Sequence, residues 1–187
     1  KVDEAFAARA HEETFRLQHG ERGERALWQH ILRVSVEDLK RNYDNLGVSF
    51  DVWLGESDAQ KYIPQMLETV KSKGLCVESE GALVVPVQEE TDAKEVPPCI
   101  LVKSDGATLY ATRDMAAAVY RKKTYDFYKS LYVVAYQQDL HFKQFFKVLE
   151  LMGKEWAKDL VHVSYGMVSM EDGAMSTRTG KVVLLED

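Results

Sequence analysis

The sequence predicts an α/β protein in which a mainly helical region with a β-hairpin precedes a doubly wound parallel sheet. Two observations indicate this fold class. In the first half of the 187 residues, apolar side chains recur at helical spacing. In the second half, short apolar stretches alternate with helical patterns, which is typical of parallel strands joined by crossover helices. We expect the two regions to span residues 1–98 and 99–187.

Composition indicates a folded protein of the reducing cytoplasm. Hydrophobic residues make up 45% of the chain, which is enough for a normal core. No apolar run reaches the roughly 18 residues that a membrane span requires. Two cysteines without a CxxC spacing favour a reduced, cytoplasmic protein. The net charge of -6 argues against a general nucleic-acid-coating surface, although it leaves room for a local RNA contact.

Three helices are predicted in the first region. Apolar side chains keep helical spacing over residues 2–19, 24–46 and 58–74. Residues 35–38 form a capping-box pattern, so the second stretch is either two consecutive helices or one helix with a bend. Pro64 falls in the first turns of the third stretch, where it disfavours a regular helix.

A hairpin and a connector complete the first region. Residues 75–87 read as a hairpin whose turn is the polar sequence E-S-E-G at 78–81. The charged stretch 91–98 ends in two prolines, which is typical of a connector.

The second region begins with a predicted strand pair and a helix. Strands are expected at residues 99–103 and 107–111, around a hairpin turn at Asp105-Gly106. Thr112 is expected to cap a helix over residues 113–123.

The remaining pattern continues the alternation of strand and helix. Residues 131–135 are apolar without alternation, as expected for a strand covered on both faces. Asp139 is expected to cap the next helix. The elements that follow are the helix 140–152, the strand 161–168, the polar loop 171–180 and the strand 181–185.

Polar side chains lie where ligands bind in such sheets. Tyr110 lies near the end of one predicted strand, and Asp114 follows in the first turn of the next helix. Gln138 follows the second strand, and residues 166–168 end the third. Ligands bind beyond the carboxyl ends of parallel strands, so these groups are expected to share one crevice. A carboxylate beside an aromatic ring suits a planar cation such as guanidinium.

Each of these residues also has a purely structural interpretation. Asp114 near a helix start is favourable through the helix dipole alone. Tyr110 in a strand is often a packing residue, and Gln138 can be a neighbour of a helix cap. The loop at 171–180 has the composition of an ordinary surface loop.

Other nucleotide and metal motifs do not fit. The chain has no GxGxxG fingerprint, and the sequence at 173–181 spaces its glycines too widely for a P-loop. His11 is followed by two glutamates but lacks a second histidine at position 15, so it forms no zinc helix. We therefore predict no protein-held metal.

Four ordered segments resemble the arginyl-tRNA synthetase family of class I enzymes. Residues 105–114 read D-G-A-T-L-Y-A-T-R-D, which is similar to its D-G-x-x-x-Y-x-T-R-D signature. Residues 138–142 and 148–153 are similar to its next helix. Residues 162–168 followed by 175–180 are similar to its form of the class I signature loop. Residues 43–51 and 55–57 are also family-like, so the resemblance covers essentially the whole chain.

The resemblance implies a fold and an activity. The fold would be the second half of a Rossmann-like catalytic domain at 99–187, preceded by a connective insertion at 1–98. The parent enzyme would join L-arginine to ATP and pass the arginyl group to tRNA(Arg). It would be a cytoplasmic monomer without a membrane partner.

The resemblance also implies site residues. Asp114 would pair with the substrate guanidinium, Tyr110 would pack against it, and Gln138 would reach the amino-acid end. The predicted ATP-binding residues are His141, Gly166, Met167, Val168, Met175, Ser176 and Arg178. Arg178, Ser176 and Thr177 are the predicted catalytic residues, which would act by electrostatic stabilisation and positioning. Mg²⁺ would arrive with ATP.

The chain departs from the class I pattern at several positions. Both lysines of the signature loop are replaced, by Ala174 and Thr177, and Tyr136 stands where a small residue is usual. The His-x-Gly-His motif is absent from the sequence. The first residue is not Met and the last residues read as a strand, so we expect a fragment cut at both ends. Such a fragment would be inactive alone and prone to self-association through uncovered edges.

Two alternatives stay open at this point. The chain could be a non-catalytic, nucleotide-like domain that binds RNA or a protein partner. A class I synthetase for cysteine or glutamine is disfavoured by Tyr110 and Asp114 together.

Overall fold

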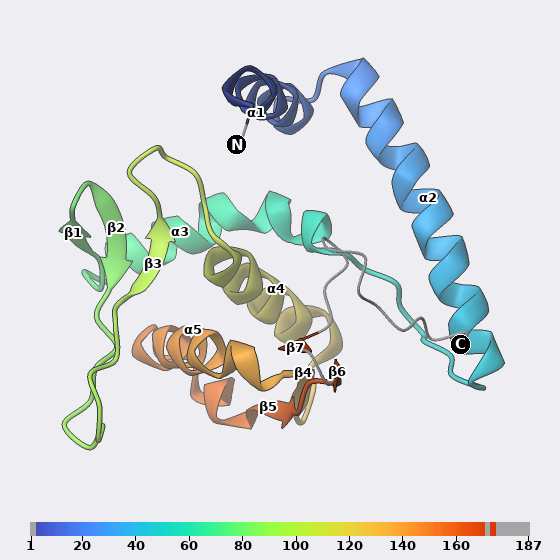
Figure 1. Cartoon of the computed structure of the whole chain (residues 1–187). Helices are drawn as coiled ribbons and strands as arrows, with labels where there is room; N and C mark the ends of the chain where they lie inside the picture. Colours follow the sequence, from blue (N-terminus) through green and yellow to red (C-terminus); the bar gives the residue numbers. More distant parts are fainter. Residues whose placement is uncertain (1–2, 171–172, 175–187) are drawn as a thin grey trace. The chain divides into compact units, whose positions relative to one another are not determined.

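The computed structural model describes residues 3–170 and 173–174 (Figure 1). The chain divides into two compact units, and their described parts are residues 3–53 in one and residues 54–170 with 173–174 in the other. Each unit is described by itself below. Within the described residues, no helix is long and apolar enough to cross a membrane.

The first unit contains two helices, and the second begins shortly after the first one ends. Helix α1 spans Glu4–Gln18, and the Asp3 carboxylate caps it by accepting hydrogen bonds from the backbone N–H groups of Ala5 and Phe6. Helix α2 spans Arg22–Asn45. The prediction of a helix near residues 2–19 is therefore confirmed.

Helix α2 is continuous over its 24 residues, so the two-helix alternative is wrong. Residues 35–38 carry a capping-box pattern but lie inside the helix, because strong helix formers on both sides favour propagation over a new start. The extended segment after α2 packs its rings against the helix end. Phe50 lies edge-on to Tyr43 at 4.8 Å and to Trp53 at 5.2 Å between ring centroids.

The second unit opens with a 3₁₀ helix that leads into an α-helix. Helix η1 spans Glu56–Tyr62 and α3 spans Ile63–Ser72. Pro64 lies in the first turn of α3, where its missing N–H leaves no hydrogen bond unmade. The α-helix therefore begins later than the sequence pattern suggested, but the helix itself is confirmed.

A short hairpin follows α3 and confirms the predicted turn. Strand β1 (Val77–Ser79) pairs antiparallel with β2 (Ala82–Val85). Glu80 and Gly81 between them have φ values of 51° and 76°. Positive φ at both central residues is the geometry of the type I′ turn that matches the twist of hairpin strands.

Strand β3 (Cys99–Val102) joins this hairpin and not the parallel sheet. It pairs antiparallel with β2, in the order β1-β2-β3. The predicted strand at residues 99–103 is therefore present, but it pairs with β2 and not with residues 107–111. The loop between β2 and β3 holds no crossover helix, and a parallel neighbour would require one.

The predicted strand at residues 107–111 is wrong. Only one isolated bridge, between Val102 and Thr108, follows the Asp105-Gly106 turn. Helix α4 (Tyr110–Tyr125) begins instead, after Leu109 as its N-cap residue. Thr112 therefore lies inside the helix and does not cap it. Its buried hydroxyl donates a 2.6 Å hydrogen bond to the Leu101 carbonyl, which fastens α4 to β3.

Two parallel strands and the helix between them follow α4 in this unit. Strand β4 (Ser130–Ala135) pairs in parallel with β5 (Leu160–Tyr165), with Ser130 opposite Leu160 and Ala135 opposite Tyr165. Helix α5 (Asp139–Leu151) connects them. A parallel pair joined through a helix is the unit that the sequence predicted here, so the α/β fold class is confirmed.

Several boundaries in this part differ from the predictions. Asp139 is the first residue of α5 and caps nothing; its carboxylate accepts a 2.9 Å hydrogen bond from the Ser164 hydroxyl. Strand β5 ends at Tyr165, and a small antiparallel pair follows it, made of β6 (Ser169–Met170) and β7 (Gly173–Ala174). The predicted strand at 181–185 lies outside the described residues.

Among the described residues, only one face of strand β4 is covered, contrary to the prediction. Leu131 and Val133 are 59% and 65% exposed, whereas Tyr132 and Val134 between them pack against the core. The sequence shows no alternation here because the residues on both faces of the strand are apolar. The two faces differ only in whether their side chains contact the core.

The core of the second unit lies around α4 and α5, which run side by side in Figure 1. Helix α4 also contacts η1, α3 and β3, and α5 contacts β3 and β5. The largest fully buried side chains are Phe145, Leu101, Met115, Leu149, Val70, Val85, Val148, Thr112 and Cys99. The two helices are thus the framework on which polar groups of this unit are positioned.

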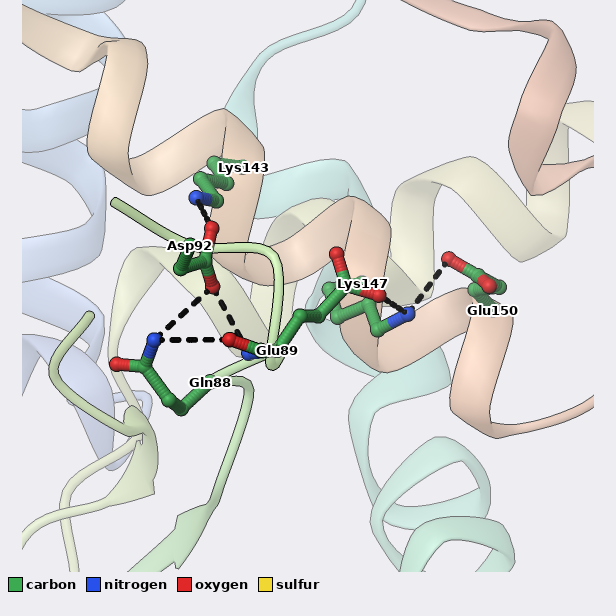
Figure 2. A network of polar contacts seen from close by, with 6 residues as sticks. All are labelled: Gln88, Glu89, Asp92, Lys143, Lys147 and Glu150. Carbon is green, nitrogen blue, oxygen red and sulfur yellow. Dashed lines mark hydrogen bonds and ion pairs between the residues drawn. The ribbon is translucent and has the colours of Figure 1, made fainter. Parts of the chain in front are cut away.

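The loop between β2 and β3, residues 86–98, is tied to α5 by charged side chains (Figure 2). The Asp92 carboxylate accepts hydrogen bonds from the Lys143 ammonium and from the backbone N–H of Glu89 at 2.8 Å. Gln88 donates to the same carboxylate at 3.3 Å. Figure 2 shows these groups gathered on one side of the helix.

A second set of contacts lies one turn further along α5. The Lys147 ammonium pairs with Glu89 of the loop and with Glu150 of its own helix, the latter at 3.1 Å. The side-chain amide of Gln144 donates a 2.8 Å hydrogen bond to the Pro97 carbonyl. Together these contacts fasten the loop at both of its ends.

Acid should weaken the contacts between this loop and α5, and Asp92→Asn tests this expectation. Lys143 and the Glu89 N–H hold the pKa of the Asp92 carboxyl below its ordinary value. The folded state therefore binds this proton less readily, so the stabilisation is present above the ordinary aspartate pKa and is lost as pH falls through the lowered one. At neutral pH, Asp92→Asn should reduce the urea midpoint of the unit, and the deficit should shrink as the solution is acidified.

Asp105→Asn is the matched control for this prediction. Asp105 also has a lowered pKa, because Lys103 and the backbone N–H of Ala107 donate to it, but its partners are local. A deficit of Asp92→Asn that persisted unchanged into acid would contradict the electrostatic account.

Candidate functional site

Tyr110 and Asp114 lie one turn apart at the start of α4. Residues four apart on a helix share a face, so the phenol and the carboxylate are neighbours. Tyr110 is exposed, and the Asp114 side chain is 32% exposed. The predicted carboxylate-and-ring pair is therefore present at the surface, although it is placed by a helix and not by a strand end.

His141 of α5 completes this group. Its Nε2 lies 2.6 Å from Oδ2 of Asp114, and its side chain is only 14% exposed. The Tyr110 ring lies edge-on to the imidazole at 5.9 Å between centroids. A carboxylate, a phenol and an imidazole from two helices thus converge on one place.

The inward face of α5 explains the position of His141. Phe142, Phe145, Val148 and Leu149 are buried on this helix, and His141 precedes Phe145 by four residues. The imidazole is thereby directed toward α4. The spacing was readable in the sequence and indicates a histidine that needs a polar partner, but it does not identify Asp114 as that partner.

Gln138 stands apart from this pair. It is the N-cap residue of α5, exposed, and three residues before His141. Among the contacts of the described residues, none joins Gln138 directly to Tyr110 or Asp114. The structure thus brings Tyr110, Asp114 and His141 together and leaves Gln138 at the end of the helix that carries the histidine.

Residues 166–168 leave the sheet at the same edge as Gln138. Ala135 and Tyr165 are opposite each other at the carboxyl ends of β4 and β5. Gly166, Met167 and Val168 follow directly and are exposed. The three residues therefore lie exposed beyond the strand ends, where ligands of parallel sheets bind.

The predicted residues of the signature loop cannot be placed. Met175, Ser176, Thr177 and Arg178 lie outside the described residues. In the part of the chain that the structure describes, no three His, Cys, Asp or Glu side chains come together to hold a metal ion.

Tyr132 forms part of the interior near the site. Its ring packs against Phe142 and Phe145, and the Arg121 guanidinium lies 5.7 Å from the ring centroid. Burial raises the pKa of Tyr132, with the Asp114 carboxylate acting weakly in the same direction. The Tyr132 phenol therefore stays neutral at physiological pH.

Comparison with known families and proteins extends over the whole chain. The family model "tRNA synthetases class I (R), catalytic domain" matches residues 1–187. An arginine–tRNA ligase of Halothermothrix orenii is 52% identical over 172 residues, which are 92% of this chain and 30% of that protein. An arginine–tRNA ligase of Agathobacter rectalis is 48% identical over 188 residues, which cover 100% of this chain and 32% of that protein. The chain thus spans about a third of the length of these curated relatives.

Solved structures agree with the fold. The arginyl-tRNA synthetase of Plasmodium falciparum superposes with a TM-score of 0.73 at 24% identity, over 83% of this chain and 27% of that one. The arginyl-tRNA synthetase of Thermus thermophilus has a TM-score of 0.68 at 20% identity, over 96% of this chain and 37% of that one. At these identities the likeness supports the fold alone.

Proposed function

The chain belongs to the catalytic-domain family of class I tRNA synthetases of the R type, and from this premise we propose that it is part of an arginine–tRNA ligase. The parent enzyme activates L-arginine with ATP, releases pyrophosphate and transfers the arginyl group to tRNA(Arg). The observation that carries the proposal is the partly exposed Asp114 carboxylate one helical turn after the exposed Tyr110 on α4.

The substrate side chain would be recognised at this pair. Guanidinium presents parallel N–H donors that match the two oxygens of a carboxylate, and its planar face packs on an aromatic ring. Asp114 would accept the donors, and Tyr110 would pack against or hydrogen-bond the plane. Gln138, one turn before His141, would contact the amino-acid end of the substrate.

ATP would bind across the strand ends. The exposure of Gly166, Met167 and Val168 at the strand ends supports a contact of their backbone groups with adenine. The resemblance assigns Met175 and Ser176 to the triphosphate, which enters with Mg²⁺ bound to its phosphates. The division into a connective insertion at 1–98 and half a nucleotide-binding domain at 99–187 is part of the same proposal.

The reaction needs no nucleophile from the protein. A carboxylate oxygen of arginine forms a bond to the α-phosphorus of ATP, and the bond from that phosphorus to the bridging oxygen breaks, so pyrophosphate leaves with the electron pair. The protein contributes positioning and charge stabilisation. Arg178 would neutralise charge that develops on the phosphates, and Ser176 and Thr177 would help to position them.

Arginine-dependent exchange of pyrophosphate into ATP tests the proposal. The parent enzyme, with tRNA present, should exchange with arginine and not with lysine or citrulline. The isolated 187-residue chain should not exchange, because its sequence lacks the His-x-Gly-His motif of class I enzymes. A parent enzyme that binds RNA without any exchange would favour the non-catalytic alternative, and turnover by the isolated chain would refute the need for the missing motif.

A further inference from the structure

His141 joins the candidate arginine site to the interior of the molecule. The resemblance assigns it a contact with ATP, yet in the structure its Nε2 lies 2.6 Å from Oδ2 of Asp114. We infer that His141 is a positioning residue that fixes the Asp114 carboxylate for recognition of guanidinium. The inference rests on the proposed arginine site and adds a residue to it.

The contact fixes the direction of the carboxylate. A carboxylate oxygen only accepts hydrogen bonds, so Nε2 is the donor. The 2.6 Å separation is short even for a hydrogen bond from nitrogen to a charged acceptor. An aspartate near a helix start otherwise rotates freely about its last torsion, which is a broad one. Because His141 of α5 binds Oδ2, the plane of the Asp114 carboxylate is fixed by contacts from both α4 and α5.

His141 is itself held in place. Aromatic rings surround its imidazole: Phe145 at 5.1 Å, Phe142 at 5.2 Å and Tyr110 at 5.9 Å between centroids. The side chain is 14% exposed, against 32% for Asp114. The carboxylate is therefore the group that a ligand reaches, and the imidazole stands behind it.

This arrangement leaves room for a substrate. Two carboxylate oxygens offer about four acceptor positions, of which the imidazole uses one. The remaining positions can receive the two parallel donors of a guanidinium, provided that the carboxylate plane is fixed. A lysine ammonium is a point charge that needs no such plane, so the positioning favours arginine in particular.

Two variants of the parent enzyme separate this role from an ATP contact. His141→Phe keeps an aromatic ring in the pocket and removes the donor, whereas His141→Gln retains an N–H donor on a longer side chain. His141→Phe should raise KM for arginine by roughly 10- to 100-fold, since loss of orientation in a site costs about that much, with KM for ATP unchanged. His141→Gln should recover most of the loss.

A double-mutant cycle tests the inference through the free energy of unfolding, independently of enzyme activity. His141→Phe, Asp114→Asn and the double variant are compared by urea unfolding of the parent enzyme. Positions that act through each other give non-additive changes. The inference would be overturned if the changes in stability were additive. It would also be overturned if His141→Phe raised KM for ATP and not for arginine, or if the two His141 variants had equal defects. Coupling in the cycle without arginine-dependent exchange by the wild type would refute the proposed function, and with it the role of the coupled pair in arginine binding.

Discussion

Asp114→Asn in the parent enzyme should lower kcat/KM for arginine by roughly 30- to 150-fold, which corresponds to about 2–3 kcal/mol. Asparagine keeps the shape of the side chain but loses the charge, and its nitrogen presents donors toward the donors of guanidinium. Removal of a charged acceptor from a hydrogen-bonded pair costs about this much, and the partial exposure of Asp114 keeps the effect below that of a fully buried charge.

Asp126→Asn is the control for this substitution. It removes the same charge from the other end of α4, where the carboxylate is exposed and pairs with Lys122. Asparagine also tolerates the left-handed backbone of this C-cap residue, whose φ is 43°. Steady-state exchange at varied arginine should show the loss in one variant and not in the other. An unchanged KM and kcat for Asp114→Asn would sink the guanidinium assignment.

Local chemistry made the helices and the first hairpin predictable. The apolar spacing of α3 and α5 is a property of one helix face, and the Glu80-Gly81 turn selects its own backbone conformation. Such signals lie within a few residues of each other. They do not depend on which element packs nearby, so the sequence contains all the information that these predictions need.

Pairing between strands depends on contacts that the local pattern does not encode. The apolar stretch of β3 is equally compatible with a parallel and an antiparallel neighbour, and its partner is β2. The residues after Asp105-Gly106 have a hairpin-like pattern, yet α4 starts at Tyr110. There the helix buries Thr112 and Met115 against the core, and this tertiary burial outweighs the local preference for a strand.

The difference between local and long-range information also applies to the candidate site. Tyr110 and Asp114 are four residues apart, so their proximity follows from the helix alone once α4 is known. His141 is 27 residues from Asp114, and its contact depends on how α4 packs against α5. The family signature assigned the first two residues to arginine and His141 to ATP, and residue types alone carry no information on the contact between His141 and Asp114.

Phe145→Ala should destabilise the second unit by about 3–5 kcal/mol, the usual cost of truncating a buried aromatic side chain. Phe145 is fully buried in α5, and its ring lies 4.6 Å from Phe146, 5.1 Å from His141 and 5.7 Å from Tyr132. The substitution removes ring contacts in three directions and leaves a cavity beneath the imidazole.

Hydrogen exchange of the α5 backbone amides measures this effect, because it reports the opening of this unit separately from residues 3–53. Leu140→Ala on the same helix is the control, since Leu140 is exposed and its truncation should change exchange little. Phe145→Leu, which fills part of the cavity, should lie between the two and stay folded.

The Phe145 variants also connect packing with function. A cavity beside His141 loosens the ring that orients Asp114, so in the parent enzyme Phe145→Leu should raise KM for arginine more than KM for ATP. The size of that change should follow the loss of protection in α5. If α5 lost protection while KM for arginine stayed constant, the carboxylate would be held by α4 alone, and the packing between the two helices would have no part in binding the substrate.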